Sequence, residues 1–265
     1  MAKAATAAKS EEIVIQKVDQ AEMKISVIGI SPLICHSMSL KVKQELLLPR
    51  GRKTAADKAS SLKHNPLQEF RDSIVKDYSP DGPTRVMMPG SAVKGSMMTG
   101  ALDAENTKKS EIGRLVSVVD ERVPIWGIPM LKMDVVRSAD INKTPDIRTR
   151  ACLMAWCTEF TVRFLTRKLT QQALVNLLDL AGVVAGIGDF RQEKGRGSYG
   201  QFSVCNHDDP EFLRIKGSAA RDIQDGALAE PQFYDEASEE LFRWYEEEVV
   251  RRGRDGGVKP LKKVA

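Results

Sequence analysis

The sequence predicts an α+β fold in which strands and helices alternate along one large domain. Three observations support this fold class. Apolar and polar side chains alternate over residues 22–30 and 156–165, which is the period of a half-buried strand. Leucines recur at helical spacing over residues 170–181, behind a threonine that suits a helix N-cap. The glycine-rich stretch 182–200 then separates this helix from an apolar strand at 200–205.

The other elements complete an order of strand, helix, two strands, helix and strand. A helix is expected over residues 91–103, with Ser91 as its N-cap, and two strands separated by a turn are expected within residues 115–128. This is the β-α-β-β-α-β order of the ferredoxin-like, or RRM-like, fold. Long insertions are expected at residues 41–85, after the first strand, and at residues 129–150, between the middle strands.

The chain of 265 residues divides into a core and three flanking segments. The core spans residues 11–205 and starts with an alternating strand at residues 11–18. Residues 1–10 are small and polar, and we expect a disordered tail there. A helical extension ending in an amphipathic helix is expected over residues 206–253, followed by a basic tail over residues 254–265.

Composition excludes several classes of protein. A net charge of +4 is too mild to indicate nucleic-acid binding by itself, so the placement of the positive charge matters more than its total. The cysteines form no C-x-x-C pair and the histidines have no metal-ligand spacing, so we expect no metal site, no disulfide framework and no cofactor. No apolar run approaches the roughly 20 residues of a transmembrane helix, and a reducing cytoplasm is the simplest location.

Residues 88–95, M-P-G-S-A-V-K-G, form the first candidate phosphate site. They are not a Walker A loop, because Lys94 precedes its neighbouring glycine, Gly95. A Pro-Gly turn into a helix capped by Ser91 presents free backbone N–H groups, with Lys94 one turn further on. Such a helix start suits a phosphate group; the alternative is an ordinary capped helix.

Residues 185–200, A-G-I-G-D-F-R-Q-E-K-G-R-G-S-Y-G, form the second candidate. This stretch follows a helix and precedes a strand, the reverse of the arrangement that a Rossmann dinucleotide-binding loop requires. Arg191, Lys194 and Arg196 stand among glycines, so backbone amides and cationic side chains can lie against a phosphodiester chain. The alternative is a mobile linker.

Both motifs resemble signatures of the RAMP superfamily, which includes the backbone subunits of CRISPR effector complexes. Residues 88–102 are similar to the superfamily's I-P-G-S-S-L-K-G-x-x-R helix start, and residues 186–202 to its G-x-x-R-x-x-G-x-G loop. Residues 31–36, S-P-L-I-C-H, together with the glycine-rich loop, also resemble uncharacterised bacteriophage proteins. This resemblance implies a phage-encoded relative that acts in the cytoplasm of a bacterial host.

The resemblance implies contacts with a nucleic-acid backbone at both motifs. The insertions at residues 41–85 and 129–150 correspond to finger-like and thumb-like loops that touch the strand and neighbouring subunits in that superfamily. The residues expected to bind nucleic acid are Ser91, Lys94, Gly95, Arg148, Arg150, Gly188, Arg191, Lys194, Gly195, Arg196 and Gly197. Further candidates are His36, Arg50, Arg52, Lys53, Arg137 and Tyr199.

The chain departs from the superfamily pattern in two places. The arginine expected shortly after K-G is replaced near Met97 and Met98, which removes one positive charge. Some family members cleave RNA with an aspartate in the loop after the first strand, whereas that loop here, S-P-L-I-C-H-S-M-S-L, contains no carboxylate. His36 is the only histidine in a motif, and the sequence gives it no catalytic partner, so a structural histidine is the simpler interpretation.

These observations predict a non-enzymatic protein that binds single-stranded DNA or RNA without sequence preference. Self-association along the strand, as a helical filament, ring or coat, is part of this prediction, and no membrane partner is expected. Phosphate contacts give sequence-independent affinity, and aromatic residues are too few for broad base stacking. Two alternatives are a phage protein-interaction or scaffold protein that does not bind nucleic acid, and an endoribonuclease-like RAMP protein.

Overall fold

The computed structural model describes residues 17–47, 64–137, 143–194 and 197–251. Several predicted features lie outside the described residues: the tail and most of the strand predicted before residue 17, the basic cluster Arg50, Arg52 and Lys53, the loop residues Gly195 and Arg196, the side chain of Lys194, and the basic tail at 254–265.

Strands and helices alternate along the described chain. The strands are β1 (Gln20–Gly29), β2 (Leu33–Ile34), β3 (Val75–Lys76), β4 (Val86–Pro89), β5 (Val116–Val118), β6 (Arg122–Arg137), β7 (Pro145–Leu165) and β8 (Phe202–Cys205). The helices are α1 (Leu40–Leu47), α3 (Pro66–Asp72), α4 (Gly90–Gly100), α5 (Lys109–Leu115), α6 (Gln171–Val184), the short 3-10 helix η1 (Gln192–Lys194), α7 (Pro210–Ser218), α8 (Arg221–Ala229) and α9 (Glu236–Arg251). Within the described residues, none of these helices has the length and apolar character that a membrane span requires.

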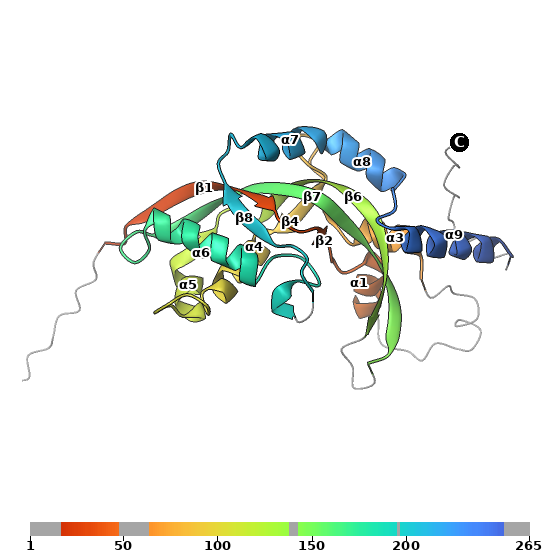
Figure 1. Cartoon of the computed structure of the whole chain (residues 1–265), viewed down its shortest axis with the longest axis horizontal. Helices are drawn as coiled ribbons and strands as arrows, with labels where there is room; N and C mark the ends of the chain where they lie inside the picture. Colours follow the sequence, from red (N-terminus) through yellow and green to blue (C-terminus); the bar gives the residue numbers. More distant parts are fainter. Residues whose placement is uncertain (1–16, 48–63, 138–142, 195–196, 252–265) are drawn as a thin grey trace, which may run out of the picture.

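The strands form one antiparallel sheet with the order β3-β4-β6-β7-β1-β8, and β2 and β5 pair with β7 beside this path (Figure 1). Four of them have the neighbour relations of a ferredoxin-like core. The first strand, β1, lies between the third, β7, and the last, β8, while the second, β6, pairs with β7. α4 and α6 are the two core helices, so the predicted α+β, ferredoxin-like fold with insertions is confirmed.

Helices cover both faces of this sheet (Figure 1). On one face α4 packs against α6 so closely that a Cβ at Gly100 would lie 2.7 Å from the Cα atom of Ala181. α7 and α8 lie on the opposite face, where Phe212 and Ile215 of α7 pack against Trp126 in β6. The face of the sheet that lies away from the core helices is therefore occupied by the chain itself.

A buried glutamine fixes α8 to the sheet. The amide nitrogen of Gln224 donates to the carbonyl oxygens of Ile125 and Gly127 at 2.8 and 3.0 Å. Its side-chain oxygen accepts hydrogen bonds from the backbone N–H groups of Arg85 and Val86 at 2.7 and 2.9 Å. Leaving a buried amide unpaired is costly, so these four hydrogen bonds fix the position of α8 against β4 and β6.

The start of α4 differs from the prediction. The helix begins at Gly90 with Pro89 as its N-cap, and the predicted cap, Ser91, lies inside the first turn, with no side-chain cap hydrogen bond at this end. A Cβ at residue 90 would lie 2.1 Å from the carbonyl oxygen of Asp120. The close approach of the helix to the β5–β6 turn therefore sets its start, in place of a capping side chain.

α6 begins as predicted and ends later. The side chain of Thr170 accepts a hydrogen bond from the backbone N–H of Ala173, as expected of an N-cap. The helix then continues past Gly182 to Val184. A Cβ at residue 182 would lie 1.9 Å from the carbonyl oxygen of Phe202, so this glycine lets α6 approach β8 and does not end the helix.

The second predicted insertion is regular in its described part, and not a loop. Residues 129–137 and 145–150 belong to β6 and β7 and pair as one long antiparallel ribbon, in which Asp134 pairs with Arg148. We call its outer part, Leu131–Arg137 and Pro145–Ala151, the arm. The exposed Val135 and the many charged residues hide the strand pattern, because a ribbon outside the core needs no continuous apolar face.

The first insertion and the C-terminal extension also contain regular elements. Residues 41–85 include the short helices α1 and α3 and the edge strand β3. The C-terminal extension contains three helices, α7, α8 and α9. Asp209 ends the turn after β8 and caps α7, because its carboxylate accepts hydrogen bonds from the N–H groups of Glu211 and Phe212 at 2.9 and 3.1 Å.

Candidate nucleic-acid interface

The glycine-rich loop between α6 and β8 is anchored to the sheet by backbone hydrogen bonds. Ile187 N–H donates to Gly200 O at 2.9 Å, which closes the base of the loop. Asp189 N–H donates to Ile34 O at 2.9 Å, and Gly200 N–H to Pro32 O at 2.8 Å. These bonds attach the loop to the segment around β2, so its described part is a structured element rather than a linker.

Glycines allow the loop to turn at two crowded positions. Gly188 has a φ of +83°, and a Cβ there would lie 2.5 Å from Leu33 Cδ1. A Cβ at Gly197 would lie 1.6 Å from the carbonyl oxygen of Phe190. The ring centroids of Phe190 and Tyr199 lie 5.9 Å apart, so an aromatic contact joins the two sides of the loop.

Arg191 braces the loop from within. Its Nη1 donates to Gly188 O at 2.8 Å, and its Nε and Nη2 donate to Glu193 Oε2 at 3.0 and 2.8 Å. A phosphate near this side chain would therefore compete with Glu193 for the guanidinium group. Glu193 also meets α4, where the hydroxyl of Thr99 lies 3.4 Å from its Oε1, so the loop touches the helix that carries the first motif.

The guanidinium group of Arg150 is buried between two carboxylates. It donates to Asp189 of the loop, and its Nη2 donates to Asp134 of the arm at 3.0 Å. Its side chain is only 5% exposed, so the charge of Arg150 does not face solvent. The sequence instead predicts that this residue binds nucleic acid. Burial opposes ionisation of Asp189, yet the hydrogen bond from Phe190 N–H and the charge of Arg150 lower its pKa. Arg150 thus joins the arm to the glycine-rich loop.

A second cation extends this network toward the C-terminus. Lys132 lies beside Arg150 in the arm and is buried, with its Nζ atom 2.9 Å from Asp134 Oδ1 and 3.4 Å from Asp235 Oδ2. The same ammonium group lies 4.5 Å from the ring centroid of Tyr234. The contact between Lys132 and Asp235 was not predicted from the sequence, since two positions 103 residues apart in the chain give no local signal.

His36 lies beside this network. Its Nδ1 atom is 4.0 Å from Asp189 Oδ2. Burial lowers the pKa of His36, Asp189 opposes this effect, and the nearby charges of Arg148 and Arg150 add to it. The charged form of His36 is therefore disfavoured at this position.

Among the described residues predicted to bind nucleic acid, the cations that reach solvent lie on the arm and on α4. Within the part of the chain that the structure describes, the exposed side chains of Arg137 and Arg148 have neither an ion pair nor a hydrogen bond. Ser91 and Gly95 are exposed on α4, and Lys94 is half-buried on the same side of the helix, away from the residues that α4 buries. The predicted residues on these two surfaces are thus Ser91, Lys94 and Gly95 on α4 and Arg137 and Arg148 on the arm.

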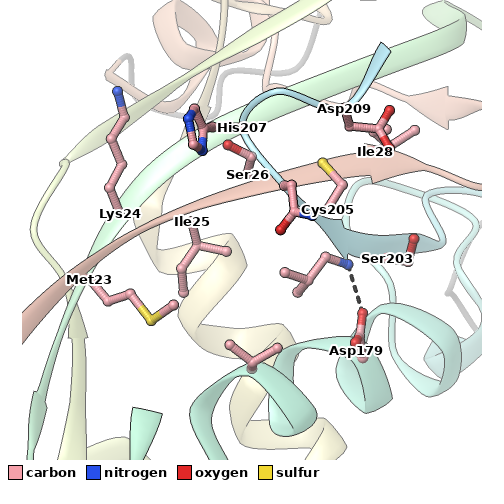
Figure 2. A pocket seen from close by; sticks show the side chains of 13 residues that line it. Met23, Lys24, Ile25, Ser26, Ile28, Asp179, Ser203, Cys205, His207 and Asp209 are labelled. Carbon is pink, nitrogen blue, oxygen red and sulfur yellow. Dashed lines mark hydrogen bonds between the residues drawn. The ribbon is translucent and has the colours of Figure 1, made fainter. Parts of the chain in front are cut away.

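A pocket of about 660 Å³ where β8 ends beside β1 is unsuited to a phosphate (Figure 2). Its lysine, Lys24, is paired with Glu159 at 3.2 Å. Asp179 points into it and accepts a hydrogen bond from Val204 N–H at 2.7 Å, and Asp209 also lines it (Figure 2). Two carboxylates and a neutralised lysine favour no anion here. Among the described residues, no group of three or more His, Cys, Asp or Glu side chains is placed to hold a metal ion.

Comparison with known proteins leaves function to be inferred from this chain. No protein-family model matches it, and no curated protein matches its sequence. It is similar to the crystal structure of Cmr6 from Pyrococcus furiosus, at 12% identity and a TM-score of 0.36, over 71% of this chain and 98% of that chain. It is also similar to a chain in the cryo-EM structure of the Type III-B Cmr-beta bound to cognate target RNA, at 9% identity and a TM-score of 0.29, over 69% of this chain and 59% of that chain. Both likenesses are too distant to bear on function.

Proposed function

We propose that this protein binds single-stranded DNA or RNA without sequence preference, through contacts to the phosphate backbone. The observation that carries the proposal is the position of the glycine-rich loop, which contacts the arm through Asp189 and Arg150 and contacts α4 through Glu193 and Thr99. The loop thereby brings both basic motifs and the arm into one structural unit. The exposed Arg137 and Arg148 on the arm and the half-buried Lys94 on α4 supply the charge that a phosphate backbone requires.

Backbone contacts are favoured over base stacking on the sheet. In RRM domains bases stack on aromatic residues of the sheet face. Here α7 and α8 cover the central part of that face, and Trp126 is buried beneath Phe212, with the Nζ atom of Lys216 4.6 Å from its ring centroid. This aromatic residue of the sheet is therefore not available to bases, which supports binding with little sequence preference.

We further propose that the protein self-associates along the strand and is not an enzyme. Each subunit offers few cations at the proposed site. Tight binding therefore requires contacts between neighbouring subunits in addition to the phosphate contacts. The arm projects its exposed Val135, which is 70% exposed, and offers one surface for such a contact. A non-enzymatic role is supported by Asp189, the carboxylate beside His36, because Arg150 already engages it.

The main test is fluorescence anisotropy with labelled single-stranded DNA, single-stranded RNA and duplex of about 10 to 60 nucleotides. We expect salt-sensitive binding to single strands that becomes tighter and cooperative as length increases, with a slope of about 0.7 in log–log salt dependence for each phosphate neutralised. The difference between DNA and RNA would name the substrate. No binding to any strand at low salt would overturn the proposal.

Removing the exposed cations should weaken binding without unfolding the protein. The double variant K94A/R148A is expected to lose at least about tenfold in affinity, because each side chain loses a charge-assisted contact to a phosphate. Its salt slope should fall by about 1.4, or 0.7 for each lost contact. The matched control K168A/R214A removes one exposed lysine and one exposed arginine elsewhere and should bind as the native protein does. Equal affinity of both variants would contradict the assignment of these two residues.

Gly95 offers a test of close approach to α4. A Cβ at residue 95 would meet no neighbouring atom within 4 Å, so alanine should stabilise the helix by about 0.5–1 kcal/mol. If a phosphate backbone approaches this turn, the added methyl group should weaken binding while the melting temperature rises. Gly226 in α8 is equally open, and G226A should raise the melting temperature with no change in binding. Weakened binding in G226A but not in G95A would contradict the proposed path of the strand.

A protein-interaction or scaffold role is the second candidate. It is favoured by the internal engagement of Arg150 and Arg191, two of the arginines expected to contact phosphate. In that case K94A/R148A would leave every activity of the protein unchanged, and the anisotropy experiment would show no binding at low salt.

A further inference from the structure

A second pocket, of about 250 Å³, lies between α1, α3 and the edge strand β3. Four cationic side chains line it, Lys43, Arg71, Lys76 and Arg122, against one carboxylate, Asp72. The pocket beside β8, by contrast, is lined by two carboxylates, Asp179 and Asp209. The composition favours an anionic ligand.

The single carboxylate does not neutralise these cations. Asp72 Oδ2 accepts a hydrogen bond from Leu40 N–H at 3.2 Å, and its Oδ1 accepts one from Gln68 Nε2 at 2.7 Å. Both oxygens thus hold the start of α1 against α3. Lys43 and Lys76 form no ion pair within the described ranges, so their charge is left for a ligand.

The two arginines keep donor groups available. Arg71 uses its Nε and Nη2 atoms on the carbonyl oxygens of Leu228 and Ala229, at 2.8 and 2.9 Å, which fixes the side chain and leaves Nη1. Arg122 uses only Nη1, at 3.3 Å from Lys76 O. The guanidinium groups are therefore held at the pocket without being neutralised there.

The charged form of Lys76 is disfavoured in the free protein. Burial lowers the pKa of Lys76, and the charges of Arg71 and Arg85 add to this effect, against the opposing charge of Asp72. A bound anion would relieve the repulsion among these cations. The arrangement thus favours binding of a phosphate over an empty pocket.

Tyr78 stands at the rim of the pocket and gives the ligand a second chemical feature. Its side chain is 79% exposed and has no hydrogen bond among the described residues. An exposed ring beside a group of cations suits a base that stacks while its phosphate is held below. A volume of about 250 Å³ admits a phosphate and part of its sugar, which leaves the base at the rim.

The chain links this pocket to the glycine-rich loop. Ile34 forms a bridge with Asp189 of the loop, and Met38, four residues further on, lines the pocket. Between them Ser37 N–H donates to Ser73 O at 2.7 Å, which holds the connecting segment against the end of α3. One short ordered segment thus runs from the loop to the pocket.

We propose that this pocket binds one nucleotide, with its phosphate on Lys43, Lys76 and Arg122 and its base on Tyr78. The inference rests on the proposed function in one respect, because the bound nucleotide is taken to be part of the bound strand. The pocket itself would also accept a free nucleotide. It adds a site for a base to a protein whose other contacts are to the backbone. A nucleotide at this point would fix the register of the strand on each subunit.

The test uses the full chain and uridine 5′-monophosphate, with uridine and inorganic phosphate as separate ligands, measured by calorimetry. We expect the nucleotide to bind more tightly than either part. Y78A should weaken nucleotide binding by about fivefold or more and leave phosphate binding unchanged, whereas Y78F should bind as the native protein does. K76Q/R122Q should weaken both ligands by about tenfold, and the matched variant K168Q/R214Q should weaken neither. Equal nucleotide binding by native protein, Y78A and K76Q/R122Q would overturn the proposal.

A cross-linking experiment separates this inference from the proposed function. Single strands that carry 5-iodouracil are irradiated with the protein, and the cross-linked residues are identified by mass spectrometry. Cross-links at Tyr78 support the pocket. A strand that binds and cross-links only at the loop or the arm overturns the pocket and leaves the proposed function standing. Nucleotide binding that depends on Lys76 and Tyr78, in a protein that binds no strand, overturns the proposed function and leaves the pocket standing.

Discussion

Replacing Arg150 with methionine is expected to destabilise the protein by about 3–5 kcal/mol, because removal of one partner from a buried ion pair leaves an uncompensated charge. Here two carboxylates, those of Asp134 and Asp189, lose their shared guanidinium group. The measurement is urea denaturation followed by circular dichroism. R148M is the matched control, since Arg148 lies two residues away on the same strand but is exposed, and its stability should change by less than about 0.5 kcal/mol.

The pH dependence of this effect has a definite sign. The pKa of Asp189 is lower in the folded protein than in the unfolded chain, so its ionisation contributes stability above the ordinary aspartate value of about 3.9. That contribution is lost as pH falls through the lowered pKa of the folded protein. The difference in stability between native protein and R150M should therefore be largest near neutral pH and shrink in acid. A difference that grows in acid, or R150M and R148M proteins of equal stability, would contradict the structural role of Arg150.

Replacing Gly200 with alanine is the second change with a large expected effect. Gly200 has a φ of +71°, a conformation that costs a residue with a side chain about 1–2 kcal/mol. A Cβ there would also lie 1.8 Å from the carbonyl oxygen of Ile187, so the backbone at the base of the glycine-rich loop must shift, at a cost of about 1–3 kcal/mol. We expect a combined loss of about 2–5 kcal/mol in the free energy of unfolding.

G200A should weaken nucleic-acid binding as well as lower the free energy of unfolding. The two backbone bonds that Gly200 makes, to Ile187 and to Pro32, anchor the loop to the sheet. Binding of single strands should therefore weaken even at temperatures where G200A remains folded. G226A serves as the control glycine substitution, because a Cβ at residue 226 meets nothing, its stability should rise and its strand binding should not change. A G200A protein as stable as G226A would show that the loop tolerates a shift at its base.

Local patterns were sufficient for most of the core. The alternation that predicts β1 reflects a strand with one buried face, and β1 spans Gln20–Gly29, within two residues of the prediction. Thr170 caps α6 because a side-chain oxygen can satisfy a free N–H group within the same turn. Both signals depend on residues close together in the chain, which is why they can be found without the fold.

The course of the arm and the place of α8 on the sheet were not predictable in the same way. The inner end of the arm packs on the core through Leu131 and Ala151, but beyond this end its strands alternate irregularly and its charges resemble those of a loop. The same absence of a local signal applies to α8, which Gln224 holds in place through hydrogen bonds to residues about 100 positions away in the chain, Ile125 and Gly127. Contacts at such separations define where a segment lies and leave no trace in its own periodicity.

The sequence by itself determined which residues carry charge, where glycines permit crowded turns, and that strands and helices follow one another in the ferredoxin-like order. Only the tertiary structure decided which charges are available to a ligand. Arg150 and Arg148 are alike in sequence, yet one is buried between two carboxylates and the other faces solvent. The physical reason is that the environment of a charge depends on groups brought together by the fold, such as Asp189 and Asp134, and not on its neighbours in the chain.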